Sequence, residues 1–195
     1  MARKSREAAA ASKASIVREA AKLFRLKGYE GTSLDDVMKA AGLTVGTFYA
    51  HFSSKADLFR AVLELGNRSS YETFMPPSAR DTRGDRWLTL FLHHYLTARH
   101  RDSVQTGCYF PTLAPDVARS GMDARRVFEE VLKGMVHGKG TEVENGASLG
   151  DAEERVLSSF CLAVGALALS RAVASKRFSK RILDAARARC VNGLR

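Results

Sequence analysis

The segment from residue 32 to residue 55 holds the side chains best suited to contact a charged partner: hydroxyls, a glycine and amphipathic rings at helical spacing. Ser33 can cap a short helix, and Gly42 stands where that helix would end in a left-handed conformation. The helix that follows would bury Phe48 and Phe52, which lie one turn apart on the same face. Two short helices joined by a glycine turn form a helix-turn-helix, whose second helix enters the major groove of DNA.

The outer face of this second helix, predicted over residues 45–52, is small and polar. Gly46 lies inside the helix, where glycine costs roughly 1 kcal/mol relative to alanine. A glycine at this position is explained if the backbone must approach a phosphate closely. Hydroxyls and rings would position the protein on phosphates, whereas Val45, Thr47 and Gly46 would face base edges. The predicted DNA-binding residues are Thr32, Ser33, Thr44, Val45, Gly46, Thr47, Tyr49, His51 and Lys55.

Other reactive side chains do not form a pattern that indicates catalysis or metal binding. The three cysteines have no paired spacing, which argues against a disulfide framework and a zinc finger. His93 and His100 lie two helical turns apart, too far to share one ion. We find no glycine-rich phosphate loop, nucleophile motif or pair of carboxylates on one face. The sequence therefore predicts no enzyme, no metal site and no cofactor.

Several short motifs around the helix-turn-helix resemble the signature of the TetR family of bacterial transcriptional repressors. They are Gly28-Tyr29, Thr32-Ser33, Ala41-Gly42-Leu43-Thr44, Gly46-Thr47-Phe48-Tyr49, His51-Phe52 and Ser54-Lys55. The resemblance implies an all-α fold with a three-helix DNA-binding head on a larger ligand-binding and dimerisation body. It also implies a homodimer that leaves its pseudo-palindromic operator in double-stranded DNA when a small molecule binds.

The resemblance also places a ligand pocket in the body and a dimer interface on the last two helices. Aromatic and polar side chains of the body lie close together in sequence, a mixture that suits a small hydrophobic or aromatic effector. The predicted pocket residues are Leu63, Asn67, Phe91, His94, Tyr95, Gln105, Thr106, Cys108, Tyr109, Phe110, Phe128 and Val131. The predicted interface residues are Phe160, Ala163, Val164, Leu167, Ala168, Arg171, Ile182 and Ala186.

The hydrophobic pattern along the chain predicts about nine helices and no strands. Residues 1–13 are basic and alanine-rich and are predicted to form a mobile arm before a helix over residues 12–27. Further helices are expected over residues 84–101, 103–114, 116–136, 151–175 and 179–190. We expect a DNA-binding domain over residues 1–53 and a ligand-binding and dimerisation domain over residues 54–195.

Charge is distributed unevenly in this 195-residue chain, whose net charge is +10. Residues 1–60 carry a net +5, residues 61–170 a net −2 and residues 171–195 a net +7. A basic N-terminal third suits a polyanionic partner. The most apolar run, residues 156–169, is too short to span a bilayer, and the N-terminus lacks the apolar stretch of a signal peptide. We therefore expect a cytoplasmic protein without a membrane partner.

Two alternatives to a ligand-responsive repressor remain open. Cys108 could sense oxidants or electrophiles, although no Lys, Arg or His lies within three residues to lower the pKa of its thiol. The protein could instead bind DNA constitutively, although a body of about 140 residues is more than that function needs.

Overall fold

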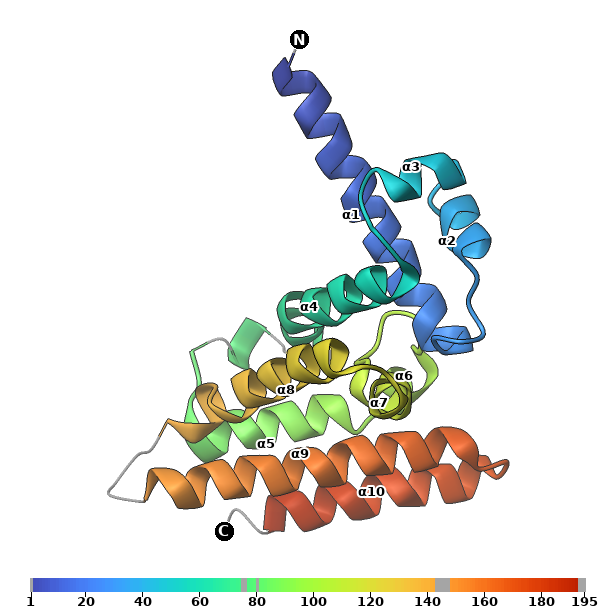
Figure 1. The fold of residues 1–195 in the computed structure, drawn as a ribbon. Coiled ribbons are helices and arrows are strands. Elements are labelled where there is room, and N and C mark those ends of the chain that lie inside the picture. The colour runs from blue at the N-terminus through green and yellow to red at the C-terminus, as the bar shows by residue number, and fades with distance from the viewer. Residues whose placement is uncertain (1, 75–76, 80, 143–147, 193–195) are drawn as a thin grey trace.

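The computed structural model describes residues 2–74, 77–79, 81–142 and 148–192, and within these ranges it contains helices and no strands. The head consists of α1 (Ala2–Lys27), α2 (Leu34–Ala40) and α3 (Val45–Tyr49). Helix α4 (Lys55–Phe74) connects the head to the body, as Figure 1 shows. The all-α fold with a helix-turn-helix head and a larger helical body is confirmed.

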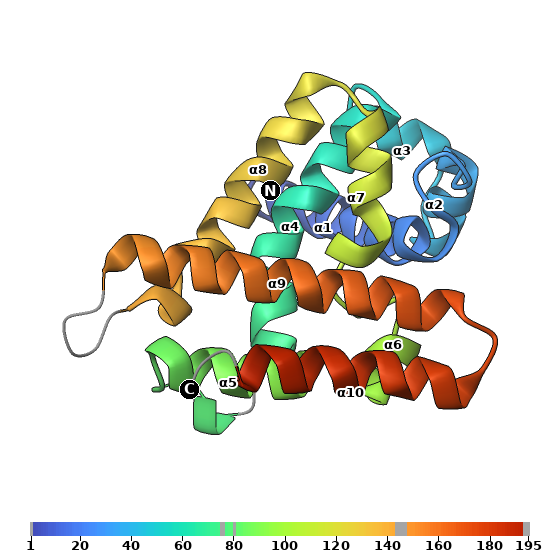
Figure 2. The same ribbon diagram turned by 90° about the horizontal axis from the view of Figure 1, so that it is seen from below.

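The body contains six further α-helices and two short 3-10 helices. The α-helices are α5 (Gly84–Tyr95), α6 (Ala98–Asp102), α7 (Phe110–Arg119), α8 (Met122–Val136), α9 (Leu149–Ala172) and α10 (Lys176–Asn192). The 3-10 helices are η1 (Pro77–Ala79) and η2 (Lys139–Thr141). Helices α9 and α10 lie side by side in a layer on the side of the molecule away from α3 (Figures 1 and 2).

The first helix is longer than predicted, because it begins at Ala2 and not near Ser12. The residues that we expected to form a mobile arm therefore belong to α1. The physical reason is helix propensity: Ala8–Ala11 are the best helix formers, and no glycine or proline interrupts the chain before Gly28. Gly28 then ends the helix with a φ of 76°, a left-handed conformation that favours glycine.

Two helices predicted in the body are each divided in the structure. The helix expected over residues 84–101 ends at Tyr95, and Thr97 then caps α6 by accepting a hydrogen bond from the backbone N–H of His100 at 3.1 Å. The helix expected over residues 116–136 is interrupted where Ser120 adopts an extended conformation. The helix expected over residues 103–114 begins only at Phe110, because the proline that follows it is favoured in the first turn. These divisions give ten α-helices in the described residues instead of about nine.

Helix α9 is long and apolar enough to cross a membrane when judged by length and composition alone. In this fold it is a packed helix of the body. Ala163 and Leu167 are fully buried on its inner face, and α10 lies along it. Packing within the chain therefore accounts for the inner face of this helix, whereas Leu157, Leu162 and Leu169 remain exposed.

Candidate nucleic-acid interface and effector site

Local signals in the sequence form the helix-turn-helix. The Ser33 hydroxyl accepts a hydrogen bond from the backbone N–H of Asp36 at 3.0 Å and so caps α2. Gly42 follows α2 with a φ of 68°, and the N–H of Leu43 donates back to the carbonyl of Met38 at 2.9 Å. These contacts satisfy both ends of the helix and confirm the predicted turn.

Helix α3 is anchored on one side and open on the other. Phe48 is fully buried and Phe52 is 3% exposed, and their ring centroids are 5.6 Å apart. On the outer face Tyr49 is 64% exposed and Val45 is 38% exposed. A Cβ atom added to Gly46 would meet only the Thr44 hydroxyl, at 3.9 Å. Packing within the chain therefore does not explain this glycine, whereas close approach of a partner does.

Three predicted DNA-binding residues are engaged within the protein. Thr32 is fully buried, and its hydroxyl donates to the carbonyl of Gly28 at 2.8 Å, so its assignment to DNA was wrong. The Lys55 ammonium lies 4.3 Å from the centre of the Tyr29 ring. The His51 side chain is half-buried beside Phe52.

The other predicted contacts lie on the outer surface of the head. Ser33, Thr44, Val45, Gly46 and Tyr49 are exposed, and Thr47 is half-buried with its hydroxyl 3.1 Å from that of Thr44. The structure therefore leaves these six residues of the predicted set accessible or partly accessible on the head.

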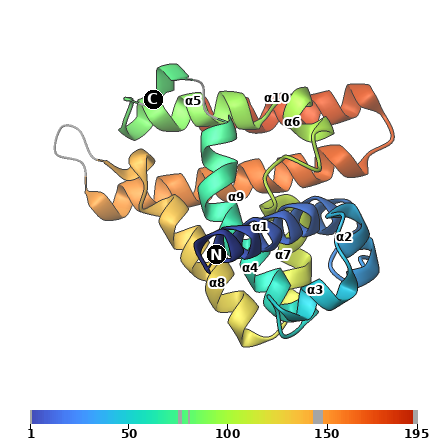
Figure 3. The same cartoon turned by 90° about the horizontal axis from the view of Figure 1, so that it is seen from above.

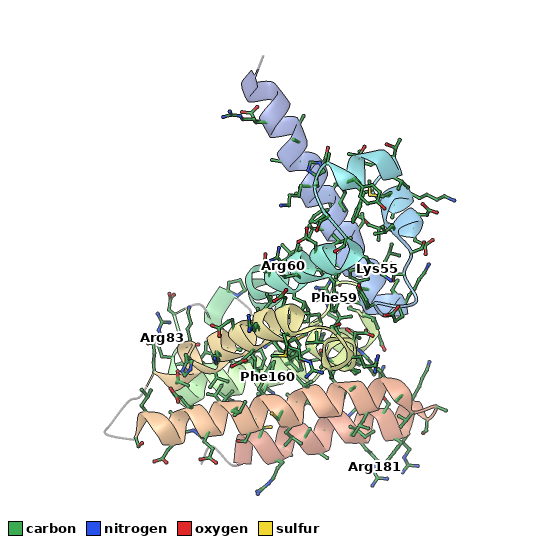
Figure 4. All side chains as sticks on the ribbon, in the orientation of Figure 1. Lys55, Phe59, Arg60, Arg83, Phe160 and Arg181 are labelled. Atoms are coloured by element: carbon green, nitrogen blue, oxygen red, sulfur yellow. The ribbon has the colours of Figure 1, made fainter. Side chains whose placement is uncertain are left out.

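The predicted pocket contains a compact cluster of aromatic rings. The Phe160 ring centre lies 5.0 Å from that of Phe110 and 6.2 Å from that of Tyr95, and Phe91 stacks on Trp87 at 5.3 Å. Figure 4 shows Phe160 pointing from α9 into the body. The space beside this cluster, lined by Trp87, Phe91 and Phe160 among others, measures about 10 Å³. That volume holds about one water molecule, so the expected open cavity does not exist here.

The polar residues assigned to the pocket do not face this cluster. His94, Gln105 and Thr106 are exposed, and the Nδ1 atom of His94 lies 3.0 Å from the carbonyl of Leu90 in its own helix. These polar residues are close to the aromatic residues in sequence, but their side chains do not lie in the interior of the body. The side chain of Asn67 lies outside the described residues. The apolar members Leu63, Phe91, Tyr95, Tyr109, Phe110, Phe128 and Val131 are buried or half-buried.

Cys108 lies in a buried polar cluster between α1 and α9. Its backbone N–H donates to the Nε2 atom of His100 at 3.0 Å, and the Nδ1 atom of His100 donates to the carbonyl of Tyr95 at 2.8 Å. Because an N–H can only donate and a carbonyl can only accept, His100 is neutral with its proton on Nδ1. Burial lowers the pKa of His100 to about 4.

The thiol of Cys108 is shielded from solvent. Burial raises its pKa, although the Tyr95 hydroxyl and the charges of Arg25 and Arg171 act in the opposite direction. A buried thiol with a raised pKa reacts slowly with oxidants, because the thiolate is the reactive form.

An open cleft lies where the head meets the body. It measures about 600 Å³ and is bordered by Tyr29 on the head, by Ala56 and Phe59 on α4, and by Arg119 and Ala124 on α7 and α8. Figure 4 shows Phe59 and Arg60 of α4 beside this junction. A cleft of this size is within the range of small-molecule sites.

Asp116 fastens α7 to the head beside this cleft. Its carboxylate accepts a hydrogen bond from the backbone N–H of Tyr29 at 3.2 Å and pairs with Arg119 at 2.9 Å. From the same side of the head, Arg25 donates to the carbonyl of Gln105 at 3.4 Å. The position of α1 is therefore linked to two segments of the body.

Half of the predicted dimer-interface residues face the interior of the chain. Phe160, Ala163, Leu167 and Ala186 are at most 5% exposed and belong to the core, so they are not available to a second chain. Val164, Ala168, Arg171 and Ile182 are half-buried.

The outer face of the α9–α10 layer carries a different apolar set. Leu157, Leu162 and Leu169 of α9 and Phe178 of α10 are between 40% and 60% exposed. Figure 2 shows this face of the molecule, with α9 and α10 running along it.

Among the described residues, no group of three or more His, Cys, Asp or Glu side chains could hold a metal ion.

Comparison with known proteins identifies the head. Residues 16–62 match the family model described as bacterial regulatory proteins, tetR family. A 65-residue stretch is 43% identical to the HTH-type transcriptional regulator AcrR of Shigella flexneri and covers 33% of this chain and 30% of that protein. A 46-residue stretch is 52% identical to the HTH-type transcriptional repressor ComR of Escherichia coli strain K12 and covers 24% of this chain and 22% of that protein. The chain therefore matches less than a third of the length of these relatives.

Solved structures extend the likeness to the whole fold. The reduced form of NemR from Escherichia coli superimposes with a TM-score of 0.73 at 18% identity, over 93% of this chain and 95% of that one. A TetR-family transcriptional regulator from Cytophaga hutchinsonii superimposes with a TM-score of 0.70 at 20% identity, over 93% of each chain. Residues 16–62 therefore match the DNA-binding head of the TetR family, and the whole chain shares the fold of solved TetR-family regulators.

The transcriptional regulator FadR from Bacillus subtilis, solved in complex with stearoyl-CoA, has a similar fold. It superimposes with a TM-score of 0.64 at 16% identity, over 92% of this chain and 96% of that one.

Two features of this protein were missed from the sequence. No sequence pattern indicates the hydrogen bond from Tyr29 to Asp116, because it joins residues 87 positions apart. The projecting first half of α1 is indicated by the alanine run at residues 8–11, whose helix propensity we underestimated.

Proposed function

We propose that this protein is a cytoplasmic, homodimeric, DNA-binding transcriptional regulator of the TetR family that acts as a repressor. The observation that supports this most is the contrast within α3, where a buried Phe48 anchors a helix whose outer face is small, polar and exposed. Such a helix fits the major groove of DNA, which is about 12 Å wide. Two heads would occupy successive major grooves and block transcription.

We propose that the outer face of α9 and α10 joins the two chains. Leu157, Leu162, Leu169 and Phe178 lie exposed on this layer, and large exposed apolar patches are typical of interfaces. A two-fold dimer would present two copies of α3 to two half-sites.

A selection experiment tests the DNA-binding proposal. The full chain is incubated with a random-sequence pool of duplexes, and bound duplexes are amplified and sequenced. We expect a pseudo-palindrome, and binding that weakens linearly when log K is plotted against log salt. Failure to enrich any sequence, together with a monodisperse monomer in light scattering, would overturn the proposal.

We further propose that a small hydrophobic or aromatic molecule releases the protein from DNA. The solved complex of the structurally similar FadR with stearoyl-CoA supports a long-chain acyl effector, and the aromatic rings around Phe160 support an aromatic one. Two locations compete. The aromatic cluster around Phe160 would have to open, because its cavity is only about 10 Å³, whereas the head–body cleft is already open with about 600 Å³.

A cleft-filling substitution separates these two locations. A panel of aromatic compounds and long-chain acyl thioesters is added to the complex of the protein with its selected duplex. Where a compound releases DNA, Ala124→Trp is compared with Ala188→Trp, which lies on α10 away from the cleft. Loss of response in Ala124→Trp alone assigns the effector to the cleft, and an unchanged response assigns it to the aromatic cluster. A panel without any releasing compound would favour a constitutive DNA-binding protein.

A further inference from the structure

The first half of α1 projects from the head. Residues 6–11 are exposed, and the first fully buried side chain of the helix is Ile16. From Ala2 to Ile16 the helix rises by about 21 Å at 1.5 Å per residue. Figure 1 shows this part of α1 extending beyond α3, and Figure 3 shows it from its N-terminal end.

The composition of the projecting part favours a polyanion over an apolar partner. Residues 2–13 contain Arg3, Lys4, Arg6 and Lys13 but only one acidic residue, Glu7. The uncharged residues between them are alanine and serine, which offer little apolar area to a second protein. This segment is therefore helical, basic and poor in large apolar groups.

The position of the segment brings it near the predicted DNA surface. The Lys13 ammonium lies 5.3 Å from the centre of the Phe52 ring, so α1 leaves the head directly beside the helix-turn-helix. The projecting part and α3 both lie on the side of the molecule away from the α9–α10 layer (Figure 1). A duplex held by α3 is thus within reach of the same helix.

We propose that residues 2–13 of α1 form a second DNA-binding element that contacts the phosphate backbone beside the site read by α3. The proposal rests on the DNA-binding function proposed above. A helix about 10–12 Å wide fits the major groove but not the minor groove, which is about 6 Å wide. With α3 in the major groove, the projecting helix meets sugar and phosphate. It therefore adds affinity for all sequences and reads no bases.

A charge-neutralising variant tests this element. Arg3→Gln, Lys4→Gln and Arg6→Gln together remove three cations per chain and keep good helix formers. The matched control is Lys176→Gln, Lys180→Gln and Arg187→Gln, which removes the same charge from α10 in the layer far from α3. These three positions avoid Arg181, whose guanidinium lies 5.9 Å from the centre of the Phe178 ring and points outward from that layer in Figure 4. Each protein is titrated with its selected duplex and with an unselected duplex over a range of salt concentrations.

We expect the α1 variant to bind both duplexes more weakly by the same factor. The slope of log K against log salt should become shallower by about 0.9 for each phosphate that the variant no longer neutralises, up to about 5 for a dimer without all six cations. The α10 control should keep the wild-type slope. Ethylation of phosphates should interfere with wild-type binding at positions flanking the α3 sites, and the α1 variant should no longer show this interference.

Three results would overturn the inference, and they differ from a failure of the proposed function. If the slope of log K against log salt were equal for the α1 variant and the α10 control, residues 2–13 would make no phosphate contacts of their own. A changed base preference in the α1 variant would assign it to base readout. The wild type could also sediment with phosphatidylglycerol vesicles when the α1 variant does not. If the two proteins then bound DNA with equal affinity, the helix would be assigned to a membrane surface. If the wild-type chain selects no duplex, the proposed function itself fails.

Discussion

Tyr49 on α3 and Tyr109 in the body are the same kind of residue used in opposite ways. Tyr49 is 64% exposed, whereas Tyr109 is fully buried, with its ring stacked on Phe110 at 4.7 Å. Burial of an aromatic ring stabilises the fold, and an exposed ring adds little to stability. The head therefore exposes side chains that a partner can cover, and the body uses the same side chains to hold itself together.

The largest effect should come from removing a ring from the body. Phe160→Ala should lower the free energy of unfolding by about 3–5 kcal/mol, because it removes a buried aromatic side chain and leaves a cavity. Urea denaturation followed by circular dichroism measures this change. A loss below about 1 kcal/mol would mean that the cluster around Phe160 is loosely packed, and the contrast between body and head would then fail.

The buried histidine should make the stability of the body depend on pH. The pKa of His100 is about 4 in the folded chain and near 6.5 when unfolded. Between these values the unfolded state binds the extra proton, so stability rises with pH and falls as pH drops from about 6.5 towards 4. The full loss is about 3 kcal/mol at 1.36 kcal/mol per pKa unit. His100→Gln should remove this part of the pH dependence, whereas His93→Gln, at an exposed position, should retain it.

Substitutions on the outer face of α3 should change binding specificity. Thr47→Ala and Val45→Ala should alter which bases are preferred, with changes of about 1–3 kcal/mol at the affected base pair. Tyr49→Phe should weaken binding to all sequences alike, as loss of a phosphate contact does. Repeating the duplex selection with each variant separates the two groups, and equal shifts in preference for both would contradict this division of roles.

The smallest effect should be that of Tyr49→Ala on folding. Because the side chain is 64% exposed, the free energy of unfolding should change by no more than about 0.5 kcal/mol. The same variant should bind its selected duplex measurably more weakly. A loss of stability comparable with that of Phe160→Ala would show that the Tyr49 side chain stabilises the fold of the head and is not free to contact DNA.

Features set by local interactions could be predicted from the sequence, whereas the choice between helix faces could not. Ser33, Gly42 and Phe48 fixed the turn and the second helix, because caps, left-handed glycines and short-range spacing act within a few residues. The split at Ser120 and the extension of α1 to Ala2 were missed, because helix ends depend on small differences in propensity.

The predicted interface illustrates the limit of face assignment. Phe160, Ala163 and Leu167 were assigned to a second chain because the resemblance places the interface on the last two helices, yet these residues pack inside the same chain. Leu162 and Leu169 of the same helix are the residues left exposed. A single chain cannot reveal which of two apolar faces its own core will take, since that depends on helices far away in sequence.

The closely packed aromatic cluster has a kinetic consequence for any effector that enters it. With a cavity of about 10 Å³ beside Phe160, such a molecule can bind only to chains whose cluster has opened. Its apparent dissociation constant is then the intrinsic one divided by the fraction of open chains. Where opening precedes binding, the observed association rate levels off at high effector concentration, at the rate of opening. A substitution that loosens the cluster would speed association and tighten apparent binding while it destabilises the fold.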